Sequence, residues 1–313
     1  MPRKTIHYIY FFWLAAFLLI TPAGARAQGA EFNVSPDLMF SGPSQNATEN
    51  LTVRLDGQYI APANFSNGLG SSEIYRTSIT AKYDRYSLNY TFSHFIWQAK
   101  DQMPPGIQGR VPWENLHDLN FQARILQGKF WDRWYYWLHA ELSSAFEADF
   151  PGAVGAGLSG ELAFDIYEGW MLGIVAKTLA LNPLNSDLFG EATFGFAVHV
   201  SQKQLRQALR YCGLASDREG SERINFSFAF TTASKTYRLA DDNPLYSNGY
   251  MSMISSKVGA YLDWLALDNL VVSIGPEFIF DRRYRLYNSS GSLESSHVQD
   301  DALGGFVGVR YMF

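Results

Sequence analysis

The chain has 313 residues, of which 16% are aromatic and 18% are charged, with a formal net charge of −5 and a mean hydropathy of −0.13. The charged fraction lies below the roughly 25% of ordinary soluble domains, yet the mean hydropathy is too polar for a bundle of membrane-spanning helices. The acidic balance argues against nucleic acid as a partner. The single cysteine excludes a disulfide framework and any thiolate metal cluster.

The first 27 residues have the pattern of an export signal. Arg3 and Lys4 precede an apolar run, and Ala25-Arg26-Ala27 forms a small-x-small cleavage site. A membrane anchor is the alternative, but the run from Ile6 to Ile20 is shorter than the about 20 residues of a spanning helix. We therefore predict a signal peptide over 1–27, cleaved after Ala27. Residues 28–50 are polar and are expected to form a periplasmic segment or a plug in the lumen of the domain that follows.

The mature chain alternates between apolar and polar residues. From Leu51 to Tyr59 the odd positions are apolar or glycine, whereas the even positions are Thr, Arg, Asp and Gln. Successive side chains of a strand point to opposite faces, so one face of this segment is apolar and the other polar. The next two segments, Tyr75–Tyr83 and Tyr86–Ser93, repeat the pattern around a two-residue Asp84-Arg85 turn. That turn pairs Tyr83 with Tyr86 on the same face.

Twelve segments of this kind predict an all-β fold. A soluble β-sandwich also alternates, but these segments are longer than its usual about 5–6 residues, and aromatic residues gather at both ends. We predict a transmembrane antiparallel up-and-down β-barrel of about 12 strands over residues 51–313. The remaining segments are Asp118–Ile125, Trp134–Ser143, Leu158–Ile166, Trp170–Ala176, Thr193–Val200, Ile224–Phe230, Tyr250–Leu262, Leu270–Phe280 and Leu303–Phe313.

The connections alternate in length, with the shorter ones expected on the periplasmic side. An elaborated turn at Ser201–Glu222 is the exception. The expected short turns are Asp84-Arg85, Gly128–Arg133, Tyr167–Gly169 and Asp263–Asn269. The expected outer loops are Ala61–Ser72, Ala99–Leu116, Glu147–Gly152, Leu181–Asp187, Leu239–Gly249 and Asp281–Asp301.

The end of the chain carries a family resemblance. The pattern Val307-x-Val309-x-Tyr311-x-Phe313, with Phe as the last residue, resembles the C-terminal signature of Gram-negative outer-membrane β-barrel proteins. The resemblance implies a location in the outer membrane, contact with its lipids, and recognition of these four residues by the barrel assembly machinery. It identifies no particular subfamily and implies no activity.

The polar faces of the predicted strands would line the lumen, and they carry seven cations and seven carboxylates. Opposite charges in a confined space must be paired or hydrated. One interpretation is a narrow passive channel for small polar solutes without strong charge selectivity. The alternative is a non-conducting structural or surface-interaction barrel whose lumen is filled by its own salt bridges. The predicted lumen-lining residues are Arg54, Asp56, Arg76, Lys82, Asp118, Arg124, Glu141, Glu161, Asp165, Lys177, Glu191, Lys257, Glu277 and Arg310.

A membrane-embedded phospholipase would need a histidine beside its nucleophilic serine. The class uses a His-x-Ser-Asn-Gly run, but Leu245 stands where the histidine before Ser247-Asn248-Gly249 would be. Ser66-Asn67-Gly68 also lacks the histidine. His199-x-Ser201 has the spacing without the Asn-Gly, and His94 faces lipid alone.

An outer-membrane protease would instead place acidic residues and a histidine at the outer rim. His297, Asp300 and Asp301 in the last loop, with Asp241 and Asp242 in the loop before, are the candidates. Loop carboxylates are more often simply solvated. We therefore expect no enzyme, no catalytic residue, no metal site and no cofactor.

Overall fold

A computed structural model describes residues 51–66, 69–98, 110–130, 133–167, 170–182, 190–201 and 224–313. Among these residues, no helix is long and apolar enough to cross a membrane. The predicted signal peptide with its cleavage site, the 28–50 segment and the 202–222 part of the elaborated turn lie outside the described residues.

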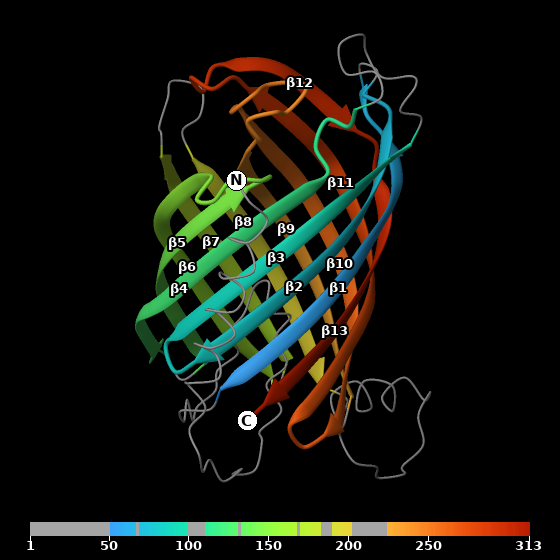
Figure 1. Ribbon diagram of the computed structural model, residues 1–313. Coiled ribbons are helices and arrows are strands. Elements are labelled where there is room, and N and C mark those ends of the chain that lie inside the picture. The colour runs from blue at the N-terminus through green and yellow to red at the C-terminus, as the bar shows by residue number, and fades with distance from the viewer. Residues whose placement is uncertain are drawn as a thin grey trace.

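Twelve strands close into one antiparallel barrel (Figure 1). Each strand pairs with its neighbours in chain order from β1 to β11, and β13 pairs with both β11 and β1 to close the ring. The predicted twelve-stranded up-and-down barrel is therefore confirmed. The strands are β1 (Thr52–Asn64), β2 (Ser71–Tyr83), β3 (Tyr86–Gln98), β4 (Asn115–Phe130), β5 (Trp134–Phe146), β6 (Ala153–Tyr167), β7 (Trp170–Asn182), β8 (Glu191–Ser201), β9 (Ile224–Arg238), β10 (Tyr250–Leu267), β11 (Leu270–Tyr287), β12 (Leu293–Gln299) and β13 (Ala302–Met312).

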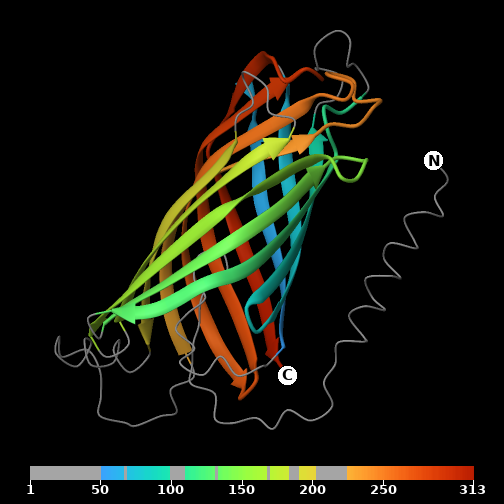
Figure 2. The same ribbon diagram turned by 90° about the vertical axis from the view of Figure 1, so that its left-hand side faces the viewer.

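The two ends of the barrel differ. The lower end in Figure 1 holds the beginning of β1 and the C-terminus, where the Phe313 amide donates to the Leu51 carbonyl at 2.9 Å. It also holds the tight Asp84-Arg85 turn, across which Tyr83 pairs with Tyr86 as predicted. The upper end carries β12 and the longer loops. Figures 1 and 2 show the strands inclined to the long axis between these ends, as closure of a sheet requires.

Several strands continue beyond their predicted ends. β4 runs to Phe130 and β10 to Leu267, so the predicted turns at Gly128–Arg133 and Asp263–Asn269 are too long. The predicted loop Asp281–Asp301 is also wrong, because β11 continues to Tyr287 and β12 folds back on it. This pairing extends the sheet above the barrel, where β12 pairs with β11 and forms one isolated bridge with Phe65.

The apolar face of each strand lies outside. Leu55 is 53% exposed whereas its neighbour Arg54 is 4% exposed. The same alternation holds in β13, where Leu303 and Val307 are exposed and Phe306 is buried. A one-residue slip in register would invert every such pair. The alternation therefore gives the barrel an apolar exterior and a largely polar interior.

The barrel is flattened at its upper end. The last residue of β5, Phe146, forms a parallel bridge with Arg238 of β9, and the Glu147 amide donates to the Arg238 carbonyl at 2.9 Å. Strands β6, β7 and β8 lie between β5 and β9 in the sheet. The contact therefore brings opposite walls together and folds these three strands into a narrow corner.

Candidate functional site

The barrel interior holds the polar residues that the alternation predicted to face it, and most of their charges form close pairs. Arg54 Nε lies 2.6 Å from Asp56 Oδ1, and Lys257 Nζ lies 2.8 Å from Glu277 Oε1. Lys177 pairs with Glu141 across β7 and β5, with the Glu141 carboxylate fully buried. Glu161 faces His139, with 3.8 Å between Oε1 and Nε2. These pairs occur within one strand, between neighbouring strands and, for Lys177 and Glu141, across the intervening strand β6.

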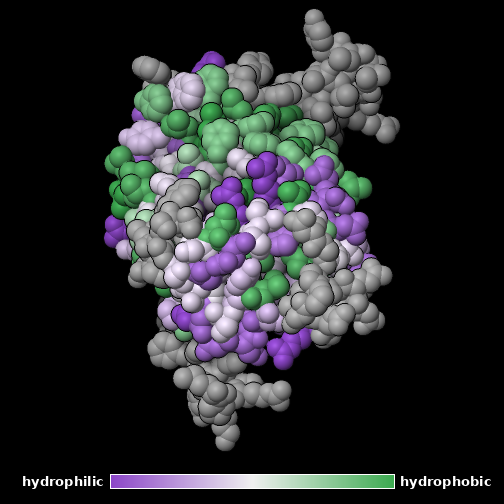
Figure 3. All heavy atoms as spheres, turned by 90° about the horizontal axis from the view of Figure 1, so that it is seen from above, coloured by the Kyte–Doolittle hydropathy of each residue, from purple (hydrophilic) through white to green (hydrophobic). Residues whose placement is uncertain are grey.

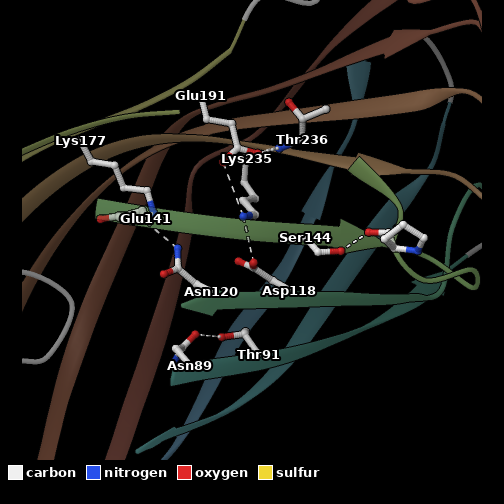
Figure 4. Close-up of polar contacts among 11 residues, drawn as sticks. Asn89, Thr91, Asp118, Asn120, Glu141, Ser144, Lys177, Glu191, Lys235 and Thr236 are labelled. Carbon is white, nitrogen blue, oxygen red and sulfur yellow. Dashed lines mark hydrogen bonds and ion pairs between the residues drawn. The ribbon is translucent and has the colours of Figure 1, made fainter. Parts of the chain in front are cut away.

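One ion-pair cluster crosses the interior near the flattened end (Figure 4). Lys235 on β9 lies with Nζ 2.9 Å from Asp118 Oδ1 on β4 and 3.5 Å from Glu191 Oε2 on β8. Strands β4 and β9 are separated by four strands in the sheet, so this lysine spans the lumen. The Thr236 amide also donates to Glu191 Oε1 at 2.7 Å. The cluster holds the two walls together just below the β5–β9 bridge.

A second cluster is centred on Glu277 of β11. Its side chain is 1% exposed and accepts hydrogen bonds from Lys257 Nζ at 2.8 Å, Tyr261 Oη at 2.6 Å and Gln58 Nε2. The Gln58 amide oxygen in turn accepts from Arg76 Nη1 at 3.0 Å. Gln58 therefore links the carboxylate on one side to a guanidinium on the other.

Arg76 is the end of that chain. Its Nε donates to Ser93 Oγ at 3.1 Å and its Nη1 to Gln58. A guanidinium has five N–H donors. Within the described residues, Arg76 forms these two hydrogen bonds to other side chains and no more. No ion pair joins Arg76 to a carboxylate of the described residues, unlike the cations of the two clusters above.

A cavity of about 930 Å³ lies beside Arg76. Strands β1, β2, β9, β10, β11 and β13 form its wall, and the side chains that reach it from the buried faces are Gln58, Arg76, Ser227, Tyr261 and Phe306. The rings of Tyr261 and Phe306 meet edge to face, with centroids 5.5 Å apart. Arg76 is the one charged residue of the lining.

Aromatic side chains close the upper end of the interior, and we call Phe65, Phe95, Trp97, Trp113 and Tyr284 the aromatic cap. Trp113 is fully buried, with ring centroids 5.1 Å from Trp97 and 5.6 Å from Tyr284. Trp97 Nε1 donates to the Trp113 carbonyl at 2.6 Å. Seen from above, side chains cover the middle of this end (Figure 3).

Two upper loops are tied to the cap by Asn243 and Glu147. Asn243 Nδ2 donates to the Pro112 carbonyl at 2.6 Å and to Glu147 Oε2 at 3.0 Å, and the Ala240 amide donates to the same carboxylate oxygen at 2.8 Å. Burial raises the pKa of the Glu147 carboxyl, and the hydrogen bonds from the Ala240 amide and from Asn243 oppose the rise. The loop over β9 and β10 is thereby fastened next to Trp113.

The remaining predicted lumen residues lie nearer the lower end. Arg124 Nη2 lies 3.7 Å from Asp84 Oδ1 in the exposed β2–β3 turn. Asp165 has one buried carboxylate oxygen without a hydrogen-bond partner within the described part of the chain. Lys82 and Arg310 are half-buried on the inward positions of β2 and β13.

The four residues of the C-terminal pattern lie on the exterior. Val307, Val309, Tyr311 and Phe313 are between 37% and 53% exposed, and the rings of Tyr311 and Phe313 meet with centroids 4.7 Å apart. They form one exposed strip along β13 at the lower end.

Among the residues that the structure describes, His94 and His297 form no hydrogen bond to the hydroxyl of Ser66 or Ser247. His94 Nδ1 pairs with Asn115 Oδ1 at 2.8 Å on the exterior. His297 is 8% exposed and its ring nitrogens contact the Ser66 carbonyl and Ser295 Oγ, at 3.3 and 3.2 Å. In the described part of the chain, no group of three His, Cys, Asp or Glu side chains has the geometry of a metal site.

Sequence reasoning missed the residues that shape the interior most. Lys235 continues the inward parity of β9 beyond Phe230, where the predicted segment stopped. Phe95 and Trp97 occupy inward positions of β3, where the preceding inward residues are polar. Large apolar residues at these otherwise polar positions were the signal in the sequence that could have revealed the cap. Trp113 lies in a loop and had no periodic signal.

The sequence matches no known protein family and no curated protein. Among solved structures, the chain is similar to the KdgM porin (7% identity, TM-score 0.42), with 83% of this chain and 99% of that chain covered. It is also similar to the NanC porin (11% identity, TM-score 0.40, 82% and 98% covered) and to the outer membrane protease OmpT of Escherichia coli (10% identity, TM-score 0.29, 84% and 97% covered). Likenesses this distant decide nothing about function.

Proposed function

We propose that the protein is a narrow passive channel for small polar solutes in the outer membrane of a Gram-negative bacterium. The observation that carries the proposal is the cavity of about 930 Å³ inside a barrel whose interior is polar and whose exterior is apolar. A closed barrel satisfies its backbone hydrogen bonds internally and can therefore cross a bilayer. The predicted lumen-lining charges would surround the solute pathway.

The exterior supports the membrane setting. Its apolar surface carries tyrosine and phenylalanine near both ends, with Tyr59, Tyr75 and Phe278 toward the top and Tyr86 and Tyr311 toward the bottom, all at least 37% exposed. Such rings are favoured at headgroup depth, and two bands mark the edges of a bilayer. Outer-membrane lipids would contact this surface. The upper end, with its longer loops, would face outward.

The C-terminal strip supports assembly by a dedicated machinery. Val307, Val309, Tyr311 and Phe313 are exposed on one strand and are accessible to a partner before the barrel meets lipid. We expect the barrel assembly machinery to read them. Removal of Phe313 should lower the amount of heat-modifiable barrel in the outer membrane while leaving unassisted refolding in detergent intact, and an unchanged amount would contradict this role.

A non-conducting structural barrel is the second candidate, and the aromatic cap favours it. The cap fills the upper end, and the Lys235 cluster crosses the lumen below it. In a channel, the cap is the narrowest barrier to solutes and must yield for conduction. In a structural barrel, removal of the cap leaves the ion conductance unchanged at zero.

Planar-bilayer conductance of the purified, refolded barrel separates the two functions. We expect small conductance steps from the unmodified chain and larger ones from Trp113→Ala, because the fully buried indole contacts four other rings of the cap. Trp264→Ala is the matched control, since Trp264 is 48% exposed on the exterior. Electrical silence of both the unmodified chain and Trp113→Ala, with gels showing folded barrels, would refute the channel.

A further inference from the structure

The lumen cavity has one charged residue in its lining, and that residue has unused hydrogen-bonding capacity. Arg76 presents its guanidinium to the cavity, with two of its five N–H groups bonded to Ser93 and Gln58. The neighbouring cations are compensated, since Lys257 pairs with Glu277 and Arg54 with Asp56. Arg76 is therefore the charged residue of the cavity lining that forms no ion pair with a carboxylate of the described residues.

The polar contacts hold this arginine in place. Ser93 and Gln58 fix the guanidinium from β3 and β1, and Gln58 is itself fixed by its bond to the buried Glu277. An arginine whose orientation is set by its neighbours loses little conformational freedom when it binds a ligand. Its planar fork matches the two oxygens of a carboxylate.

The rest of the cavity is suited to an apolar group. Phe306 and Tyr261 offer ring surfaces, and Gly275, Gly304 and Gly305 expose backbone without side chains. The volume of about 930 Å³ lies at the upper end of the range of small-molecule sites, about 300–1,000 Å³. The Arg54 guanidinium, 5.4 Å from the centroid of the Phe306 ring, is already paired with Asp56, so Arg76 is the cation of the lining that can hold an acidic group beside these rings.

We propose that this cavity binds monovalent organic anions with an apolar body, with Arg76 holding the acidic group and Phe306 and Tyr261 contacting the body. The site deepens the proposed channel function, because it names the class of solute that the lumen prefers. Binding itself does not require conduction, so the site can be tested in the folded barrel in detergent.

The test uses benzoate, with benzamide as its neutral counterpart of similar shape, in ligand-observed NMR titrations of the refolded barrel. Benzoate should bind more tightly than benzamide. Arg76→Gln should weaken benzoate binding about tenfold, because a hydrogen bond to a charged group is lost. Lys82→Gln is the matched control, since Lys82 is an inward cation outside the cavity lining and its loss should leave benzoate binding unchanged.

Arg76→Lys keeps the charge and should recover part of the affinity, which a merely structural role of Arg76 would not predict. Equal binding of benzoate and benzamide by the unmodified chain would overturn the site without any variant. Full benzoate affinity in Arg76→Gln would overturn it as well. A silent bilayer with selective benzoate binding would refute the channel and leave the site standing, so the two failures are distinguishable.

Discussion

Single carboxylates fasten the interior and the upper loops of this barrel, and Glu277 shows how much depends on one of them. It accepts from Lys257, Tyr261 and Gln58 while almost fully buried. Burying a carboxylate is costly unless its charge and lone pairs are satisfied. Three donors from β1 and β10 satisfy this one, so the residue joins strands that are not all neighbours.

Loss of the Glu277 charge should destabilise the barrel more than loss of its whole ion pair. Glu277→Gln leaves Lys257 as a partly buried cation without its partner and should lower the free energy of unfolding by about 3 kcal/mol. Lys257→Met combined with Glu277→Gln should regain much of that loss, because no unpaired charge of this ion pair remains. Urea titrations followed by tryptophan fluorescence in detergent measure both.

Asp281→Asn serves as the control for that experiment, because its pair with Arg283 is exposed. It should change stability by about 0–1 kcal/mol. A double variant that is no more stable than Glu277→Gln would show that hydrogen bonding, rather than charge pairing, dominates this cluster.

Glu147 predicts a pH dependence in the upper loops. Burial raises the pKa of its carboxyl in the folded protein. A raised folded pKa gives stability that is present below the unfolded value of about 4.3 and is lost as pH rises through the folded value. Glu147→Gln stays neutral and can still accept from the Ala240 amide. At pH 4 the variant and the unmodified chain should match, and at pH 7 the variant should hold its loop more firmly.

Hydrogen exchange of the Ala240 amide, compared between the two proteins at each pH, checks this prediction. The intrinsic exchange rate cancels in such a comparison, so the ratio reports loop opening alone. Stronger protection of the unmodified chain at pH 7 would show that the charged carboxylate is the better acceptor despite its burial.

At the scale of strands, close approach of β6 and β7 depends on a missing side chain. A Cβ added to Gly157 would overlap the Thr178 carbonyl oxygen, whereas one added to Gly160 would meet nothing within 4 Å. Gly157→Ala should therefore cost about 1–3 kcal/mol through displacement of β7. Gly160→Ala lies on the same strand and should be neutral or stabilising by about 0.4–1 kcal/mol.

Thermal unfolding followed by heat-modifiable migration on gels compares these two glycine variants directly. Equal melting temperatures for Gly157→Ala and Gly160→Ala would mean that β7 yields without loss. Both substitutions add one methyl group to the same strand, at an interior position for Gly157 and at an exterior position for Gly160.

The sequence predicted which residues of a strand face the exterior and which face the interior. It could not predict contacts between distant strands. Alternation placed Leu55 outside and Arg54 inside because each strand has one lipid-compatible face. The end of β10 was missed because apolar residues continue past the membrane-length segment as far as Leu267. The end of β11 was missed because residues 281–287 are mostly charged and resemble a polar loop. The Lys235–Asp118 pair depends on how far the closed ring is flattened, which no single strand encodes. The aromatic cap joins residues 65, 95, 97, 113 and 284, so only the assembled ring brings it together.

For the whole molecule, the apolar exterior is the feature that ties the barrel to a bilayer. Leu158 is 49% exposed near the middle of β6, and Leu293 is 48% exposed at the start of β12, above the barrel. In water the two leucines are equivalent in exposure. In a bilayer they are not, because only Leu158 lies at the depth of the hydrocarbon core.

Leu158→Arg should therefore make folding into liposomes less favourable by about 2–4 kcal/mol, and Leu293→Arg by about 0–1 kcal/mol. The difference arises from placing a charge at the bilayer midplane in one case and in water in the other. Urea-dependent folding into phosphatidylcholine vesicles measures it. The same variants in detergent micelles should differ less, because a micelle deforms around the arginine. Equal costs in vesicles would mean that β6 does not cross the bilayer, and the exposed leucines would then need a protein partner instead.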